Sequence, residues 1–264
     1  MQLMRVPGIN GLEKTKGCRN AGTAIIAALR DIKTSEKGKP INVSLLDLEE
    51  SHVDNSNLEE QEGLIYKNSK NAFETQNKII FLGGDHSITF PITRAFKDSF
   101  EDPCLIVFDA HADSMKPMKQ PTHEEWLRAL VEDGFPKESI LLVGARNIEQ
   151  EELIWLNKEG IKRIDIGELI NNIEDTTDAI MEFSSRKNLY VSLDIDVVDP
   201  VYAPSTNYPE AAGLSSRQLI YIFQRIAMMK NLKAVDIVEV DSEKDKKKDN
   251  VTVKLAAKIV AELV

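Results

Sequence analysis

The sequence predicts an α/β protein whose parallel β-sheet is covered by helices on both faces. Short runs rich in Ile, Val and Leu recur at wide intervals, and the segments between them are polar with a helical spacing of apolar residues. Chains that alternate strand and helix in this way form parallel sheets with helices on both sides. The 264 residues are 42% hydrophobic, enough for a sizeable core, and we expect one domain over residues 1–264.

The predicted elements follow from these runs. Six runs have the composition of buried strands: Ile41–Leu48, Lys78–Leu82, Leu105–Phe108, Ile140–Val143, Leu189–Leu193 and Ala234–Val240. Four other segments have the length and spacing of helices: Ala21–Ile32, His123–Asp133, Glu149–Glu159 and Ser215–Met229. The most polar stretches, around 49–62 and 242–250, are short enough to be loops, and no internal repeat is present.

The charge balance and the cysteine count exclude several classes of protein. The chain has 33 Lys and Arg against 43 Asp and Glu, a formal net charge of −10, which argues against a nucleic-acid partner. No stretch approaches the roughly 18 apolar residues of a membrane span, and the N-terminal segment lacks the apolar core of a secretory signal. We therefore expect a soluble, cytoplasmic protein without a membrane partner. With only Cys18 and Cys104, any metal must be held by His and carboxylate ligands.

Polar side chains follow five of the predicted strands at the point where each strand ends. Lys78–Leu82 leads into GGDHS, Leu105–Phe108 into DAHAD, Ile140–Val143 into GARN, Leu189–Leu193 into DIDVVDP, and Ala234–Val238 into Glu239. The two glycines of GGDHS would let the backbone turn tightly as the strand ends. Ligands of open parallel sheets bind beyond the carboxyl ends of the strands, so we expect these side chains to face one site.

The residues at these strand ends predict a metal centre. Six of them carry metal-binding side chains: His86, Asp109, His111, Asp113, Asp194 and Asp196. Spacings of two residues direct side chains the same way in an extended strand end. Four converging carboxylates repel one another unless they are protonated or neutralised by cations. Oxygen-rich ligation with some imidazole suits Mn²⁺, although zinc could also bind, and a shared carboxylate would hold two ions about 3.5–4 Å apart.

These segments resemble the ureohydrolase family, which includes arginase, agmatinase and formimidoylglutamase. The resemblance covers Gly83–Ser87, Asp109–Asp113, Ser192–Pro200 and Asp236–Val240, in the expected order. It implies a three-layer α/β/α sandwich with a central, mostly parallel sheet and two Mn²⁺ ions per chain at the carboxyl ends of the strands. It further implies that one ion is held by His86, Asp109, Asp113 and Asp194, and the other by Asp109, His111, Asp194 and Asp196.

The resemblance also implies roles for residues around the ions. Glu239 would bind the guanidinium of the substrate, because a planar guanidinium matches a carboxylate in a two-bonded fork. Asp113 would orient a hydroxide held between the ions and take up its proton, and His123 would pass a proton to the leaving amine. Each role has a structural alternative. Glu239 could be an ordinary strand-end residue, and His123 could begin a helix capped by Thr122 and Glu125.

Two segments depart from the family pattern. Most relatives have a glycine directly after the histidine, where this chain has Glu124, and the loop from Asp113 to His123 is short. The segment APSTNYPEAAGLSSR replaces the usual APGTGTPE-x-GGL form, with Ser205 in place of a glycine. Pro204, Pro209, Glu210 and Gly213 keep their places.

The same loop bears on the choice of substrate. In arginases an asparagine of this loop helps to hold the substrate carboxylate, and Met115 stands at its position. Lys116 and Lys119 could replace that contact, and Glu149 aligns with an acid that holds the α-amino group of arginine. Cationic and anionic groups on opposite rims would suit arginine, so the sequence favours an arginase over an agmatinase, a formimidoylglutamase or a guanidino-acid hydrolase.

Two alternatives from other classes stay open. One is a catalytically silent relative that keeps the fold and the metals, which the full ligand set and Glu239 disfavour. The other is an amide hydrolase with a single zinc, which would hold one metal per chain. Trimers and hexamers are usual in the family, so the resemblance also implies a homo-oligomer.

Overall fold

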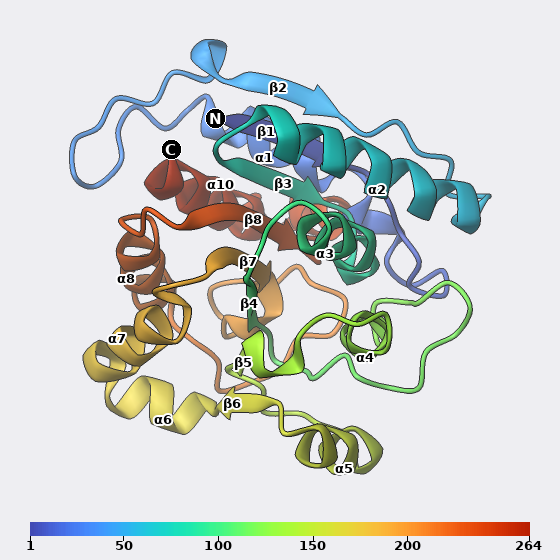
Figure 1. The fold of residues 1–264 in the computed structure, drawn as a ribbon. Coiled ribbons are helices and arrows are strands. Elements are labelled where there is room, and N and C mark those ends of the chain that lie inside the picture. The colour runs from blue at the N-terminus through green and yellow to red at the C-terminus, as the bar shows by residue number, and fades with distance from the viewer.

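The computed structural model describes residues 1–264 and centres on one eight-stranded sheet (Figure 1). The strand order is β2-β1-β3-β8-β7-β4-β5-β6, and all neighbouring strands are parallel. The strands are β1 (Gln2–Val6), β2 (Asp47–Glu50), β3 (Ile79–Gly83), β4 (Pro103–Phe108), β5 (Ile140–Val143), β6 (Lys162–Ile164), β7 (Asn188–Asp194) and β8 (Leu232–Val238). The predicted parallel sheet is confirmed.

Ten α-helices surround the sheet in two sets, which Figure 1 shows on either side of the strands. They are α1 (Ala21–Leu29), α2 (Leu58–Thr75), α3 (Thr89–Lys97), α4 (Trp126–Glu132), α5 (Gln150–Glu159), α6 (Ile166–Asn171), α7 (Ile173–Ser184), α8 (Ser216–Ile226), α9 (Ser242–Asp245) and α10 (Val251–Leu263). None of them has the length and apolar composition that crossing a bilayer requires.

The two faces of the sheet have separate hydrophobic cores because side chains alternate along each strand. In β4, Ile106 and Phe108 pack with residues of α1, α8 and α10. Leu105 and Val107 of the same strand pack with residues of α2, α3, α4 and α5. The sheet is thus the middle layer of three, as the family resemblance implied.

Several predictions of local structure were wrong. The polar stretch at 242–250 is not a loop, since it contains α9 and a 3₁₀ turn at Lys246–Lys248. The predicted strand at 41–48 is mostly a loop with a 3₁₀ turn at Val43–Leu45, and β2 begins only at Asp47. The side chain of Asn42 caps this turn by accepting the backbone N–H of Ser44 at 3.1 Å, a local bond that competes with strand pairing. The polar stretch at 49–62 is not only loop, since α2 starts at Leu58. Neither β1 nor β6 was predicted.

The strand order places the predicted site. Five consecutive strands, β3, β8, β7, β4 and β5, lie side by side and run in the same direction. Each of them ends in one of the motif segments, so residues far apart in the sequence meet at one edge of the sheet. Neither Gly83 nor Gly84 of GGDHS has a positive φ, so the predicted tight turn does not explain these glycines. Gly84 is needed for space, because a Cβ there would lie 1.7 Å from the carbonyl oxygen of Gly8.

Candidate active site

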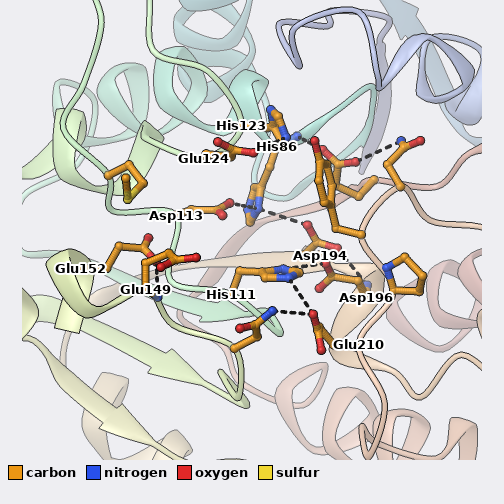
Figure 2. Close-up of a pocket in the computed structure, with 16 residues that line it drawn as sticks. His86, His111, Asp113, His123, Glu124, Glu149, Glu152, Asp194, Asp196 and Glu210 are labelled. Carbon is orange, nitrogen blue, oxygen red and sulfur yellow. Dashed lines mark hydrogen bonds and ion pairs between the residues drawn. The ribbon is translucent and has the colours of Figure 1, made fainter.

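A cavity of about 580 Å³ opens at the carboxyl edge of the sheet (Figure 2). Its lining includes residues that follow β3, β4, β5, β7 and β8, together with the loop between β7 and α8. Figure 2 shows the labelled histidines and carboxylates converging on this space from several elements. The predicted convergence of the motif segments is therefore seen in the structure.

His86 lies at the base of this cluster with 1% of its side chain exposed. Its Nδ1 atom is 2.8 Å from Oδ2 of Asp113, 3.1 Å from Oδ2 of Asp109 and 3.3 Å from Oδ2 of Asp194. Nδ1 of His86 and Oδ2 of Asp109 are both buried without a hydrogen-bond partner. Three carboxylate oxygens thus surround one ring nitrogen.

The other ring nitrogen of His86 is held by a hydrogen-bonded chain. Its Nε2 is 2.9 Å from Oγ of Ser192, which donates to Oδ1 of Asp236 at 2.7 Å. Ser192 and Asp236 are opposite each other in the register of β7 and β8. Because the serine proton goes to Asp236, the serine oxygen accepts the proton of Nε2, so Nδ1 is the ring nitrogen that can offer a lone pair to a cation. Burial lowers the pKa of His86, but the three carboxylates around Nδ1 raise it well above its ordinary value, so without a cation Nδ1 carries a proton.

His111 makes a second cluster that shares Asp109 with the first. Its Nδ1 is 3.0 Å from Oδ2 of Asp196 and 3.5 Å from Oδ1 of Asp109. His111 is more accessible, with 22% of its side chain exposed, and its Nε2 lies 3.8 Å from Glu210 at the cavity wall. All six sequence-predicted ligand residues are thus close together.

The backbone around Asp109 differs from the extended strand end that the spacing suggested. β4 ends at Phe108, and Asp113 has a positive φ of 47°. The side chains nevertheless converge, because Oδ1 of Asp196 accepts the backbone N–H of Ala110 at 3.1 Å, and this bond ties the segment to the end of β7.

The electrostatics of the cluster fit divalent cations. Burial and the charge of Asp109 raise the pKa of Asp113 to about 7. Burial and neighbouring carboxylates also raise the pKa values of Asp194 and Asp196. Burial alone would lower the pKa of His111, but bonds to Asp109 and Asp196 raise it to about 12. Bound cations would remove the repulsion that these shifts express, and they would pair with the lone pair on His86 Nδ1.

Glu239 lies beside the cluster at the end of β8, and 3% of it is exposed. Its Oε1 accepts the backbone N–H of His86 at 2.9 Å, and its Oε2 is 3.4 Å from Nδ2 of Asn207. Burial and the charge of Asp85 raise its pKa to about 8. No Lys or Arg lines the cavity, so this buried carboxylate has no permanent cationic partner there.

His123 also lines the cavity, outside the helix that was predicted to begin there. α4 starts at Trp126, and the Thr122 hydroxyl accepts the N–H of Glu124 instead of completing a capping box with Glu125. His123 is 5% exposed, and neither ring nitrogen has a hydrogen-bond partner. Asp113 is oriented from the same segment, since its Oδ2 accepts the indole N–H of Trp126 at 2.9 Å.

The residues predicted to hold the substrate tail, the part of the substrate beyond its guanidinium, fall into two groups. Glu149 and Met115 line the cavity. Lys116 and Lys119 do not, and Lys119 has 76% of its side chain exposed and pairs with Glu59 at 2.8 Å. The loop that carries both lysines turns these two side chains outward.

Several cavity residues were not singled out from the sequence. Glu152, Asn207 and Tyr208 line the cavity, and Ser192 supports His86 from behind. The signal for Ser192 was available, because it precedes Asp194 by two residues on the same face of a strand. The contacts of Asn207 and Tyr208 depend on a loop conformation that no spacing reveals.

The fold and the site define an α/β protein with a histidine–aspartate cluster at the carboxyl edge of a parallel sheet. A profile of the arginase family matches residues 2–264, and the chain belongs to this family. The resemblance found in the sequence is confirmed.

Named relatives agree with this assignment at low identity. N(1)-aminopropylagmatine ureohydrolase of Thermus thermophilus is 30% identical over 184 residues, which are 69% of this chain and 61% of that protein. Mitochondrial arginase 1 of Oryza sativa is 29% identical over 187 residues, 70% of this chain and 54% of that protein. The matches thus span less than two thirds of these relatives. The crystal structure of formimidoylglutamase from Bacillus subtilis superposes with a TM-score of 0.90 at 21% identity, covering 99% of this chain and 85% of that one, which supports the fold.

Proposed function

We propose that this chain is a metal-dependent hydrolase that cleaves a guanidino C–N bond of a small substrate and releases urea. The observation that carries the proposal is the pair of His–Asp clusters that share Asp109, with buried Glu239 beside them. Such a pair fits two divalent cations, and the buried carboxylate fits a planar guanidinium.

The six clustered residues would hold the two cations. His86, Asp109, Asp113 and Asp194 would hold one, and Asp109, His111, Asp194 and Asp196 the other. When bound, two such cations supply Lewis acidity that lowers the pKa of water at the site. Mn²⁺ suits this oxygen-rich donor set with two imidazoles.

The protein's own groups would orient the reactants. Glu239 would receive the guanidinium at a buried carboxylate whose Oε1 already accepts the N–H of His86. Asp113, fixed by the Trp126 indole, would accept the proton of the attacking water. His123 would donate a proton to the departing nitrogen, and its two unpartnered ring nitrogens are free for that task.

The charge of the cavity supports a substrate with a cationic tail. Its lining contains five glutamates and three aspartates but no Lys or Arg. Arg146 lies near the wall, but its guanidinium is used by backbone carbonyl oxygens, including those of Asp196 and Glu210 at 2.9 and 2.7 Å. With Lys116 and Lys119 outside the cavity, the lining has no Lys or Arg to neutralise a carboxylate. We therefore propose a guanidino amine, such as agmatine, as the preferred substrate. Arginine is the second candidate, because Glu149 could hold its α-amino group.

A series of guanidines that differ only in tail charge tests both parts of this proposal. Release of urea by the Mn²⁺-loaded protein is measured with agmatine, butylguanidine and 4-guanidinobutyrate, and with arginine for comparison. The expected order of kcat/KM runs from cationic through neutral to anionic tail. The reverse order would contradict the choice of substrate while keeping the reaction, and no turnover of any guanidine would contradict the reaction itself.

A matched pair of variants locates the tail contact. Glu149→Gln removes a charge from the cavity wall, whereas Glu151→Gln removes one from the outer surface of α5. The first should raise the KM for agmatine about threefold to tenfold with little change in kcat, because a partly solvated ion pair contributes about 1 kcal/mol. Neither substitution should change the KM for butylguanidine, whose tail is uncharged. Equal effects of the two substitutions would show that Glu149 has no specific contact.

A further inference from the structure

His123 is held in the cavity without hydrogen bonds. Both ring nitrogens are buried and neither has a partner. The carboxylate of Glu124 is the charged group near it, and its Oε1 lies 3.6 Å from Nε2, beyond hydrogen-bond distance. The orientation of this ring must therefore come from packing.

Tyr208 supplies that packing. Its ring centroid is 5.3 Å from that of His123, with 31° between the planes, which lies within the range of favourable aromatic pairs. The edge of His111 meets the same tyrosine at 6.4 Å and 80°. The Tyr208 hydroxyl is buried and has no hydrogen-bond partner, so the ring makes these contacts and the hydroxyl does not.

The loop around Tyr208 is itself anchored. The backbone N–H of Tyr208 donates to Oγ1 of Thr206 at 3.2 Å. The neighbouring Asn207 accepts Nζ of Lys244 at 2.7 Å through its side-chain oxygen and donates to Sγ of Cys18 at 3.1 Å. Lys14 also covers the tyrosine, with its Nζ 5.5 Å from the ring centroid. A ring held in this way can restrict its neighbour.

Both departures from the family pattern meet at this contact. In the segment APSTNYPE, Tyr208 stands where the usual form has a threonine, and Glu124 stands where a glycine usually follows the histidine. His123 and Tyr208 are far apart in the chain but adjacent in the cavity. A threonine has no ring with which to stack on the imidazole.

We propose that Tyr208 is a positioning residue that holds the imidazole of His123 toward the reacting centre by ring stacking. The proposal rests on the role of His123 as proton donor in the proposed reaction. The ring of Tyr208 packs against both the proton donor and His111, so loss of the ring lets the imidazole of His123 turn away from the substrate nitrogen. Substrate binding at Glu239 should change little, because its carboxylate is held by the N–H of His86 and the side chain of Asn207 rather than by Tyr208.

Three substitutions test this role by kinetics in the Mn²⁺-loaded protein. Tyr208→Thr removes the ring, Tyr208→Phe keeps it, and Tyr202→Thr is a control at an exposed tyrosine of the same loop. Tyr208→Thr should lower kcat at least tenfold with KM changed less than about threefold, since a general acid contributes about 10²- to 10⁴-fold. Tyr208→Phe, which keeps the ring, should retain most of the wild-type kcat. Full kcat in Tyr208→Thr, or equal losses in the Thr and Phe variants, would overturn the proposal.

A second measurement does not depend on turnover. The full chain labelled with ¹³C and ¹⁵N histidine is examined by NMR with diamagnetic Mg²⁺, and His123→Asn assigns the resonances of His123. The imidazole protons of His123 should be shifted by the tyrosine ring in the wild type and in Tyr208→Phe, and should lose that shift in Tyr208→Thr. Unchanged resonances in Tyr208→Thr would overturn the proposal even if every guanidine is hydrolysed. If the wild type hydrolyses none, the proposed function fails, while the NMR result still decides whether the ring holds His123.

Discussion

The two histidines of the cluster occupy different environments. We call the set His86, Asp109, Asp113 and Asp194 the inner position, and the set Asp109, His111, Asp194 and Asp196 the outer position. The inner histidine is almost fully buried, and its second nitrogen is held by the Ser192–Asp236 chain. The outer histidine is 22% exposed, and its second nitrogen has only Glu210 nearby, at 3.8 Å.

This difference suggests separate roles for the two positions: one is suited to hold a cation tightly, and the other is suited to bring a cation and the substrate together. A hydrogen bond to the far nitrogen of a ligating histidine fixes its tautomer and raises its affinity for metal. The inner position has that support and the more deeply buried histidine, so we expect it to bind its cation more tightly. Both positions border the cavity, and the outer position is the more accessible of the two. Substitutions at the shared carboxylate, at each histidine and behind His86 should therefore have different effects on metal content.

Asp109→Asn should have the largest effect, because its two oxygens face the two histidines separately. We expect loss of both cations after dialysis and loss of detectable urea release. Metal analysis by mass spectrometry and the urea assay check this. Asp98→Asn, at an exposed carboxylate that accepts the hydroxyl of Tyr66, is the matched control and should keep both cations. Full metal content in Asp109→Asn would contradict the shared ligand.

Single histidine substitutions should separate the two positions. His111→Ala should retain one cation per chain, since the inner position keeps all its ligands. His86→Ala should lose the tightly bound cation and leave the outer position weakly filled. Metal content after dialysis against a series of chelator concentrations checks both. If His86→Ala retains metal better than His111→Ala, the ranking of the two positions is wrong.

Ser192→Ala should weaken the inner position without removing a ligand. Loss of the bond to Nε2 of His86 should reduce the affinity for the tighter cation about 10- to 100-fold, the usual effect of such support. Competition with a metal chelator measures this affinity. Ser184→Ala, at a buried serine whose hydroxyl donates only to carbonyl oxygens of α7, is the control and should leave this affinity unchanged. An unchanged affinity in Ser192→Ala would show that the chain behind His86 has no part in metal binding.

The stability of the metal-free protein should fall as the pH rises from 6 to 8. The pKa of Asp113 is raised to about 7 by burial and Asp109, so below that pH the folded state binds a proton that the unfolded state has released. His111 acts in the same direction above pH 6.5, the ordinary pKa of histidine. Its pKa is raised in the folded state, which therefore keeps a proton that the unfolded state releases. We expect the free energy of unfolding to drop by about 3 kcal/mol over this interval, since each pH unit costs about 1.4 kcal/mol for every proton held only in the folded state.

Urea denaturation in chelator and in saturating Mn²⁺ checks the pH prediction. The drop should disappear with Mn²⁺, because bound cations replace the protons. A metal-free protein that becomes more stable between pH 6 and pH 8 would contradict the electrostatics assigned to the cluster.

The clustering of the six predicted ligand residues was predictable from the sequence, and the placement of the residues predicted to contact the substrate was not. Asp109 and Asp194 directly follow or end buried strands, and parallel strands in one sheet bring their carboxyl ends to the same edge. Local spacing and sheet topology were therefore sufficient. Lys119 was assigned to the substrate because it lies in the right loop, but the direction of a loop side chain depends on partners such as Glu59, which lies 60 residues away in sequence.

Strand periodicity and residue type are local properties, so they were enough to predict a parallel sheet, the order of its motif segments along the chain and the chemistry available at its carboxyl edge. The tertiary structure was needed to show which ring nitrogen of His86 is held by Ser192, that the cavity has no Lys or Arg, and that Tyr208 packs on His123. Those facts depend on how loops from different strands pack together, and packing between distant segments leaves no periodic trace in a single sequence.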